Sequence, residues 1–116
     1  MKVLLVNSFD AKGGASIAAM RLHQSLNKEN VENQFLVQFK LSNNQEVLSE
    51  TNFFIIFLNK ILSKLDALIG RILLKDVNNY SAAFLSSINI VNKINKLNPD
   101  IVHLHWTCNG MLSIED

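Results

Sequence analysis

The chain has few of the residues that mark disulfide-bonded, collagen-like or disordered proteins: one cysteine, one proline and four glycines among 116 residues. The lone cysteine, Cys108, cannot form an internal disulfide, which fits a reducing compartment such as the cytosol. Charged residues make up only 18% of the chain and hydrophobic residues 48%, a balance that excludes intrinsic disorder. A chain of this length and composition is expected to fold as one domain with a buried core.

Neither sign of charge predominates, and no long apolar run is present. The formal net charge is +1, so the chain lacks the basic field of nucleic-acid-binding proteins, and we expect no nucleic-acid partner. The longest apolar run, residues 53–58, is far shorter than the roughly 20 residues that span a bilayer. The apolar residues that follow Lys2 are too few for a secretory signal. We therefore expect a cytoplasmic protein.

The hydrophobic pattern alternates between short apolar runs, typical of buried strands, and longer stretches with apolar residues at helical steps of three and four. Because the connections between the expected strands are too long for hairpins, the pattern predicts an α/β fold with a parallel sheet. The expected strands are residues 2–7, 34–39 and 100–105. The expected helices are residues 15–28, 53–75 and 81–97, with a further helix starting at 111–116, and loops are expected at 8–14, 41–52 and 77–80.

Two adjacent glycines, Gly13 and Gly14, lie between the first strand and the first helix in the stretch NSFDAKGGASIAAMRLH. A strand, a glycine-containing loop and a helix N-terminus form an anion-binding arrangement, because free backbone N–H groups and the helix dipole favour negative charge. Glycine lets a phosphate or a sugar approach the backbone, and Ser16 adds a hydroxyl. The fingerprints GxGxxG and GxxxxGK[ST] are absent, so a turn that lets the helix pack on the sheet stays open as the alternative.

The expected last strand ends in DIVHLH, which places His103 and His105 on one face because side chains alternate along a strand. Together with Cys108 they could ligate zinc, but no fourth ligand follows at a recognisable spacing, and we expect no metal. Packed, hydrogen-bonded histidines are the simplest interpretation. For His105 the alternative is contact with a substrate, because open α/β sheets bind ligands at the carboxyl ends of their strands.

Other polar and aromatic residues have two interpretations each. Trp106 either stacks on a sugar ring or is a half-buried core residue. Arg21 and His23 on the first helix are expected to form a partly exposed polar face rather than a catalytic group. Asn109 and Gly110 predict a turn.

Two segments, NSFDAKGGASIAAMRLHQSL and NPDIVHLHWTCNGMLSIED, resemble the bacterial glycosyltransferases of the large retaining family four, which have the GT-B fold. The most similar group synthesises colanic acid and other exopolysaccharides; there a GGAS-like loop precedes IAA.RLH, and a PDIVHLHW strand precedes LSIE. The resemblance implies two Rossmann-like domains with a cleft between them. Residues 1–116 would then be an incomplete, partial Rossmann-like N-terminal domain on the acceptor side, with the donor-binding C-terminal domain absent.

The resemblance also implies a function. The intact enzyme would transfer a sugar, with retention, from a nucleotide-diphosphate sugar donor to a saccharide or lipid-linked acceptor in surface polysaccharide synthesis, without a cofactor. It implies a catalytic role for His105 and binding of the donor or substrate by Gly13, Gly14, Ser16 and Trp106. We expect the 116 residues alone to be inactive. The alternatives are a non-catalytic nucleotide- or sugar-binding module and an inactive truncated remnant.

The expected helix 53–75 carries an apolar stripe at steps of three and four, with cations on its other side. We favour packing of the stripe on the sheet or on the missing part of the protein, because a parallel sheet is covered on both faces. The alternative is peripheral contact with the anionic inner membrane surface. Bare apolar surface in this fragment predicts poor solubility or self-association. The stripe consists of Phe54, Leu58, Ile61, Leu65, Leu68 and Ile72, and the cations are Lys60, Lys64, Arg71 and Lys75.

Overall fold

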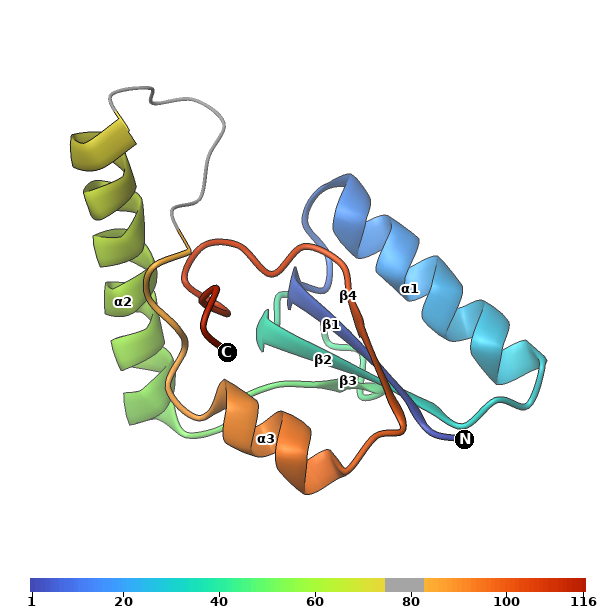
Figure 1. Ribbon diagram of the computed structural model, residues 1–116. Coiled ribbons are helices and arrows are strands. Elements are labelled where there is room, and N and C mark those ends of the chain that lie inside the picture. The colour runs from blue at the N-terminus through green and yellow to red at the C-terminus, as the bar shows by residue number, and fades with distance from the viewer. Residues whose placement is uncertain (75–82) are drawn as a thin grey trace.

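A computed structural model describes residues 1–74 and 83–116 of the chain. Their strands form one parallel sheet in the order β3-β2-β1-β4 (Figure 1), which confirms the α/β fold class and is compatible with a partial Rossmann-like domain. The strands are β1 (Val3–Phe9), β2 (Asn33–Phe39), β3 (Val47–Leu48) and β4 (Ile101–Leu104). The helices are α1 (Gly13–Lys28), α2 (Phe53–Leu74) and α3 (Ile90–Leu97).

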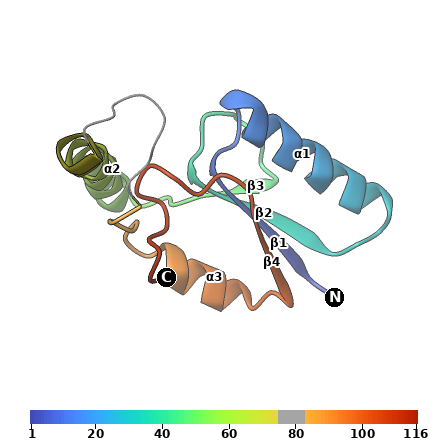
Figure 2. The same cartoon turned by 45° about the horizontal axis from the view of Figure 1, so that its top comes forward.

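The sheet lies between two helices, with α1 on one face and α3 on the other (Figure 2). Alternate residues of β1 point to opposite faces, so that Leu5 packs with Ala19 of α1 while Leu4 packs with Ile90 of α3. Met111, from the segment after β4, joins the α3 side of the core and is fully buried. The central strands are buried on both faces, which explains why their sequences read as continuous apolar runs.

The parallel arrangement brings the carboxyl ends of β1 and β4 to the same edge of the sheet. In the register of the sheet, Leu5 pairs with Phe35 of β2 on one side and with His103 of β4 on the other. The loop after β1, which carries the paired glycines, is therefore next to the segment that follows β4. Open parallel sheets bind their ligands at this edge.

Several predicted boundaries are wrong at the site itself. β1 continues to Phe9, two residues beyond the predicted end, and α1 begins at Gly13, so that both glycines belong to the first turn of the helix. β3 lies inside the predicted loop 41–52 and makes the sheet four-stranded. β4 ends at Leu104, so His105 comes just after it. The expected helix at 111–116 is absent, and the backbone there forms turns.

The predicted helix 81–97 is also wrong, because α3 begins only at Ile90; residues 81 and 82 lie outside the described residues. The backbone amides of residues 84, 85 and 88 donate instead to side chains of α2, and Ser87 N donates to Met111 O over 3.1 Å. Asn89 has a φ of 74°, a left-handed conformation that interrupts a helix. Long-range hydrogen bonds therefore replace the local ones that the periodicity predicted.

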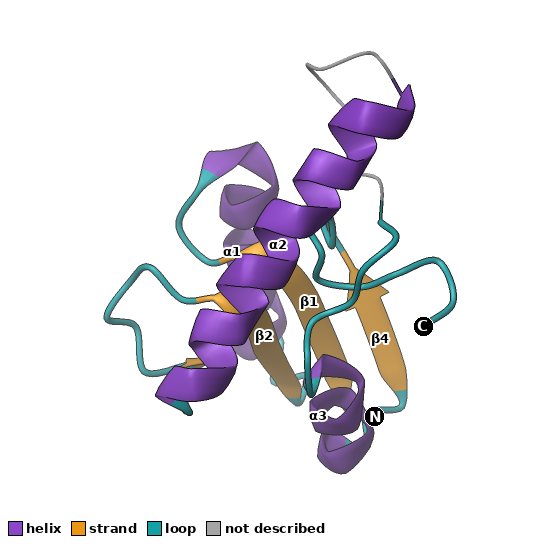
Figure 3. Ribbon diagram, turned by 90° about the vertical axis from the view of Figure 1, so that its left-hand side faces the viewer, coloured by secondary structure: helices purple, strands orange, loops and turns teal. Residues whose placement is uncertain are grey.

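The helix predicted at 53–75 is present as α2, although Lys75 and the predicted loop 77–80 lie outside the described residues. α2 lies beyond the carboxyl ends of β1 and β2 rather than flat on a face of the sheet (Figure 1), and it crosses in front of these strands when they are viewed from that side (Figure 3). The stripe therefore does not pack on the sheet, and packing on the missing part of the protein, the other favoured arrangement, stays a prediction. Its two buried side chains, Asn59 and Asp66, are polar, and the predicted stripe is exposed except at Leu58, which is half-buried. Within residues 1–74 and 83–116, no helix combines the length and the hydropathy that crossing a membrane requires.

Candidate functional site

Gly13 and Gly14 form the start of α1, and the space in which their side chains would lie is empty. Gly13 has a φ of +81°, which glycine adopts without strain, whereas the φ of Gly14 is ordinary. A Cβ at either position would meet nothing within 4 Å. The residue before the helix, Lys12, places no side-chain hydrogen bond on the first amides, and the first turn has no acidic residue. The N-terminal amides of α1 are therefore not capped by a side chain at Lys12, and an anion can approach them.

A hollow of about 260 Å³ opens directly onto these glycines. Three of the residues predicted for binding, Gly13, Gly14 and Trp106, lie together in its wall, which shows that the loops after β1 and β4 share one depression. The complete wall consists of Phe9, Lys12, Gly13, Gly14, Ala15, Trp106 and Asn109.

An aromatic row runs along this edge. The ring of Trp106 stacks on Phe9 with 6.1 Å between centroids, and Phe9 also contacts Phe39, 5.8 Å away. The ammonium group of Lys12 lies 5.1 Å from the centre of the Phe9 ring, within cation–π range. Trp106 is 39% exposed, so part of its ring surface is available to a ligand, while its stacking on Phe9 fixes its position. The sequence reasoning missed Phe9 because β1 was expected to end before it.

Two buried polar residues at the end of β1 hold the site together. Asn7 accepts a hydrogen bond from Trp106 N at 2.8 Å and donates through Nδ2 to Phe9 O at 2.6 Å and to Ser16 Oγ at 3.1 Å. Ser8 N donates to Trp106 O, and Ser8 Oγ donates to Cys108 O at 2.7 Å. These contacts tie the loop after β1 to the segment after β4. The signal in the sequence is the abrupt change from apolar residues to Asn7 and Ser8.

Ser16, predicted to bind the donor, is 1% exposed and does not line the hollow. Its hydroxyl lies 2.6 Å from Lys12 O and 2.9 Å from Phe9 O, and it accepts the bond from Asn7. These contacts hold the β1–α1 loop in shape around the glycines. Ser16 therefore positions the loop rather than facing a ligand in this conformation.

His105 lies just past β4 on the α1 side of the sheet. It does not line the hollow, but Trp106, the next residue in the chain, does. Its backbone N–H donates to Val6 O at 2.9 Å, and its Nε2 is 3.1 Å from Nδ1 of His103. The ring is partly exposed, so solvent reaches it. Burial, and then the neighbouring His103 imidazole, lower the pKa of His105 below its ordinary value. A neutral imidazole, able to donate or accept, is therefore present at pH 7.

Two other side chains considered from the sequence have structural surroundings. His23 was expected to be partly exposed, but it is buried, hydrogen-bonded through Nδ1 to Asn33 Oδ1 and packed near the ring of Phe35. Arg21 is exposed on α1. Within the described residues, no cluster of three or more His, Cys, Asp or Glu side chains is arranged to hold a metal ion.

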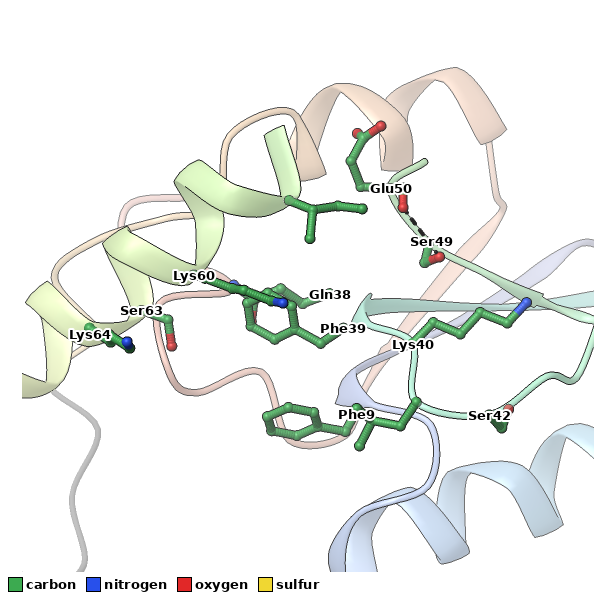
Figure 4. A pocket seen from close by; sticks show the side chains of 12 residues that line it. Phe9, Gln38, Phe39, Lys40, Ser42, Ser49, Glu50, Lys60, Ser63 and Lys64 are labelled. Carbon is green, nitrogen blue, oxygen red and sulfur yellow. Dashed lines mark hydrogen bonds between the residues drawn. The ribbon is translucent and has the colours of Figure 1, made fainter. Parts of the chain in front are cut away.

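A second, larger hollow of about 580 Å³ lies between α2 and the carboxyl ends of β1 and β2 (Figure 4). Phe9 lines both hollows, so they adjoin at this ring. Lys60 and Lys64 of α2 reach its wall, and the Oε1 atom of buried Gln38, also in the wall, has no hydrogen-bond partner. The sequence did not reveal this hollow, because the placement of α2 creates it. Its polar wall residues are Gln38, Lys40, Ser42, Ser49, Glu50, Lys60, Ser63 and Lys64.

The fold and this edge define an α/β protein with a parallel sheet and two adjoining hollows at the carboxyl ends of its strands. No protein-family model, no curated protein and no solved structure matches the chain. The residues themselves therefore carry the functional argument.

Proposed function

We propose that this chain forms the acceptor-side part of a retaining glycosyltransferase of the GT-B type. In this proposal the amides beside Gly13 and Gly14 contact the diphosphate of a nucleotide-sugar donor, and the second hollow receives a saccharide or lipid-linked acceptor. The two segments that resemble family-four enzymes are residues 7–26, from the end of β1 into α1, and residues 98–116, which contain β4 and the residues after it. Gly13 and Gly14 of the first and Trp106 of the second line one hollow. β4 is also an edge strand with all four residues exposed, where a sheet can be extended.

The observation that carries the proposal is the open space at Gly14. Neither its φ nor a close neighbour requires glycine there, since a Cβ would meet nothing within 4 Å. The alternative, that both glycines serve helix packing, therefore has no contact to support it at this position. A ligand that approaches the backbone from the hollow gives a physical reason for the missing side chain.

The proposed chemistry depends on charge that develops at the leaving diphosphate. As the bond between the sugar and the diphosphate breaks, negative charge grows on the phosphate oxygens, and uncapped amides at the start of α1 stabilise it. Lys12, at the mouth of the hollow, adds positive charge. Neutral His105 lies beside the hollow, where it can hydrogen-bond a sugar hydroxyl.

The second hollow suits an acceptor that carries both polar and apolar groups. The lysines at positions 60 and 64 favour an anionic group such as a phosphate. Phe9 lines both this hollow and the one beside the glycines. The donor and the acceptor would therefore meet at the edge of this ring, where the two hollows adjoin.

A fluorescence titration tests the donor site directly, because Trp106 is the only tryptophan in the chain and lies in the wall of the hollow. We expect UDP or GDP to change the Trp106 emission in a saturable manner, and uridine or guanosine without phosphate to have a much weaker effect. The variant Gly14→Val should bind at least tenfold more weakly, because its side chain projects into the space that the diphosphate occupies.

The matched control is Ala18→Val, which adds similar bulk to an exposed position one turn further along α1. It should bind as the wild type does. If neither nucleotide perturbs Trp106, or if Gly14→Val and wild type bind equally, the glycines do not form the donor site. Saturable binding without transfer of labelled sugar by a longer form of the protein would instead favour a non-catalytic binding module.

A further inference from the structure

The helix α2 has a clear apolar stripe in its sequence, yet the stripe is not the face that it buries. Its two buried side chains, Asn59 and Asp66, are polar, and the apolar side chains on the same side, such as Ile56 and Leu62, are half-buried. Asn59 is 4% exposed and its Oδ1 accepts a hydrogen bond from Ile88 N at 2.8 Å. Asp66 is fully buried and its Oδ1 accepts from Phe84 N and Leu85 N at 2.9 and 3.0 Å. Directional hydrogen bonds thus hold the apolar face outward.

The outward stripe is continuous along the helix. Its members follow one another at steps of three and four residues and are between 40% and 67% exposed. A bare apolar face along a helix of 22 residues, about 33 Å long, is far from the scattered exposed residues of an ordinary surface. The outward stripe consists of Phe54, Phe57, Ile61, Leu65, Leu68 and Ile72, with exposed Phe57 in place of Leu58 of the predicted stripe, which is half-buried.

Charge decides between the occupants that could cover this face. Lys60, Lys64 and Arg71 are exposed, and each follows a stripe residue by three positions, so the cations lie along one flank of the stripe. The only carboxylate of α2 is Asp66, which is buried. A second copy of α2 would therefore bring cations against cations, whereas anionic lipid headgroups complement all three.

We propose that α2 is an interfacial helix that docks the protein on an anionic lipid bilayer surface. The stripe enters the boundary between headgroups and acyl chains, and the flanking lysines and arginine extend to lipid phosphates. The start of the helix is capped in the free protein, since Asn52 Oδ1 accepts from Phe54 N at 3.0 Å, so docking requires no helix formation. The inference depends on α2, two of whose cations, Lys60 and Lys64, also line the second hollow, and it is independent of nucleotide binding at α1.

Sedimentation with lipid vesicles tests the proposal on the 116-residue chain. We expect binding to phosphatidylcholine vesicles containing about one third phosphatidylglycerol, weakened by added salt, and much weaker binding to phosphatidylcholine alone. The double variant Lys64→Gln, Arg71→Gln should bind the anionic vesicles roughly 25-fold more weakly, at about fivefold for each cation removed. The double variant Phe54→Ser, Phe57→Ser should bind more than tenfold more weakly.

The control variants make the same chemical changes on α1. Arg21→Gln with Lys28→Gln removes the same charge, and Ile17→Ser removes an exposed apolar side chain; both should bind vesicles as the wild type does. Circular dichroism checks that every variant is folded. The proposal is overturned if the wild type does not bind anionic vesicles or if the α1 variants lose binding equally. It is also overturned if the chain is a dimer that Phe54→Ser, Phe57→Ser converts to monomers without any vesicle binding.

Discussion

At the scale of the residue, the site depends on one side-chain contact between distant parts of the chain and one between near neighbours. Asn7 Oδ1 accepts a hydrogen bond from Trp106 N across 99 positions, whereas the rings of His105 and His103 are only two positions apart. The paired imidazoles matter for any chemistry at this edge, because only one of two nitrogens 3.1 Å apart carries the shared proton. A second proton would place two like charges side by side, which disfavours the charged form of His105.

We therefore predict that His103→Ala raises the pKa of His105 toward its ordinary value, because the repulsion from the neighbouring imidazole is removed while burial remains. A pH titration of the imidazole resonances by NMR measures this. Val102→Ala, on the opposite face of β4, is the control and should leave the titration unchanged. A His105 pKa that stays constant or falls in His103→Ala would show that the two rings do not interact.

At the scale of the element, α2 is attached to the rest of the protein by a few close contacts rather than by an apolar seam. The turn after β4 is one of them. Gly110 has a φ of +65°, and its carbonyl oxygen accepts hydrogen bonds from Gln38 Nε2 and Ser87 Oγ, each over 3.0 Å. A Cβ on Gly110 would lie 3.3 Å from the Cα atom of Ser63, so the turn approaches the backbone of α2 directly. This contact fixes how far α2 stands from the sheet and hence the width of the second hollow.

The substitution Gly110→Ala should lower the free energy of unfolding by about 2 kcal/mol, because a left-handed φ is strained for alanine and the new methyl group meets a backbone atom. Urea unfolding followed by circular dichroism gives the value. Gly14→Ala is the matched control: with an ordinary φ and open space, it should be neutral or stabilising by up to about 1 kcal/mol. Equal effects of the two substitutions would contradict the close approach at Gly110.

At the scale of the whole molecule, one buried carboxylate joins the two loops that border the hollows. Asp10, directly after β1, accepts hydrogen bonds from Leu41 N at 2.7 Å and Ser42 N at 3.1 Å, and also from the hydroxyl of Ser42. Burial raises the pKa of Asp10, but these hydrogen bonds outweigh it and bring the pKa below the ordinary value. The charged carboxylate thus holds the carboxyl edge of the sheet together.

Stability should consequently depend on pH through Asp10. A carboxyl whose pKa is lowered by folding stabilises the protein above its unfolded pKa, and this contribution is lost as the pH falls through the lower, folded value. Asp10→Asn should therefore lower the free energy of unfolding at pH 7 by about 2 kcal/mol. In acid, the difference in this free energy between the variant and the wild type should become smaller. Urea unfolding at pH 7 and at about pH 3 measures both quantities.

The control is Glu32→Gln, an exposed carboxylate on the loop before β2, which should change stability by less than about 0.5 kcal/mol at either pH. If the free energies of unfolding of Asp10→Asn and wild type differ by the same amount at neutral and acid pH, the charge of Asp10 does not hold the loops.

The sequence by itself determined the features that depend on neighbours along the chain. The apolar runs at β1 and β2 and the alternation with α1 predict a parallel α/β protein, because burial on both faces leaves a continuous apolar strand. The paired glycines between a strand and a helix were also readable as a candidate site, since the signal is local. The remaining predictions about substrate and partners rest on resemblance.

Only the tertiary structure decided what depends on distant contacts. The side chains of Asn59 and Asp66 accept hydrogen bonds from backbone N–H groups of the segment before α3, so the predicted helix is shortened there. The same contacts turn the apolar stripe of α2 outward. Helical periodicity shows that a face is apolar but not which way it points, because the direction is set by the partners of the opposite face. Phe9 and the second hollow escaped prediction for the same reason: their neighbours lie on other elements, out of reach of any local pattern.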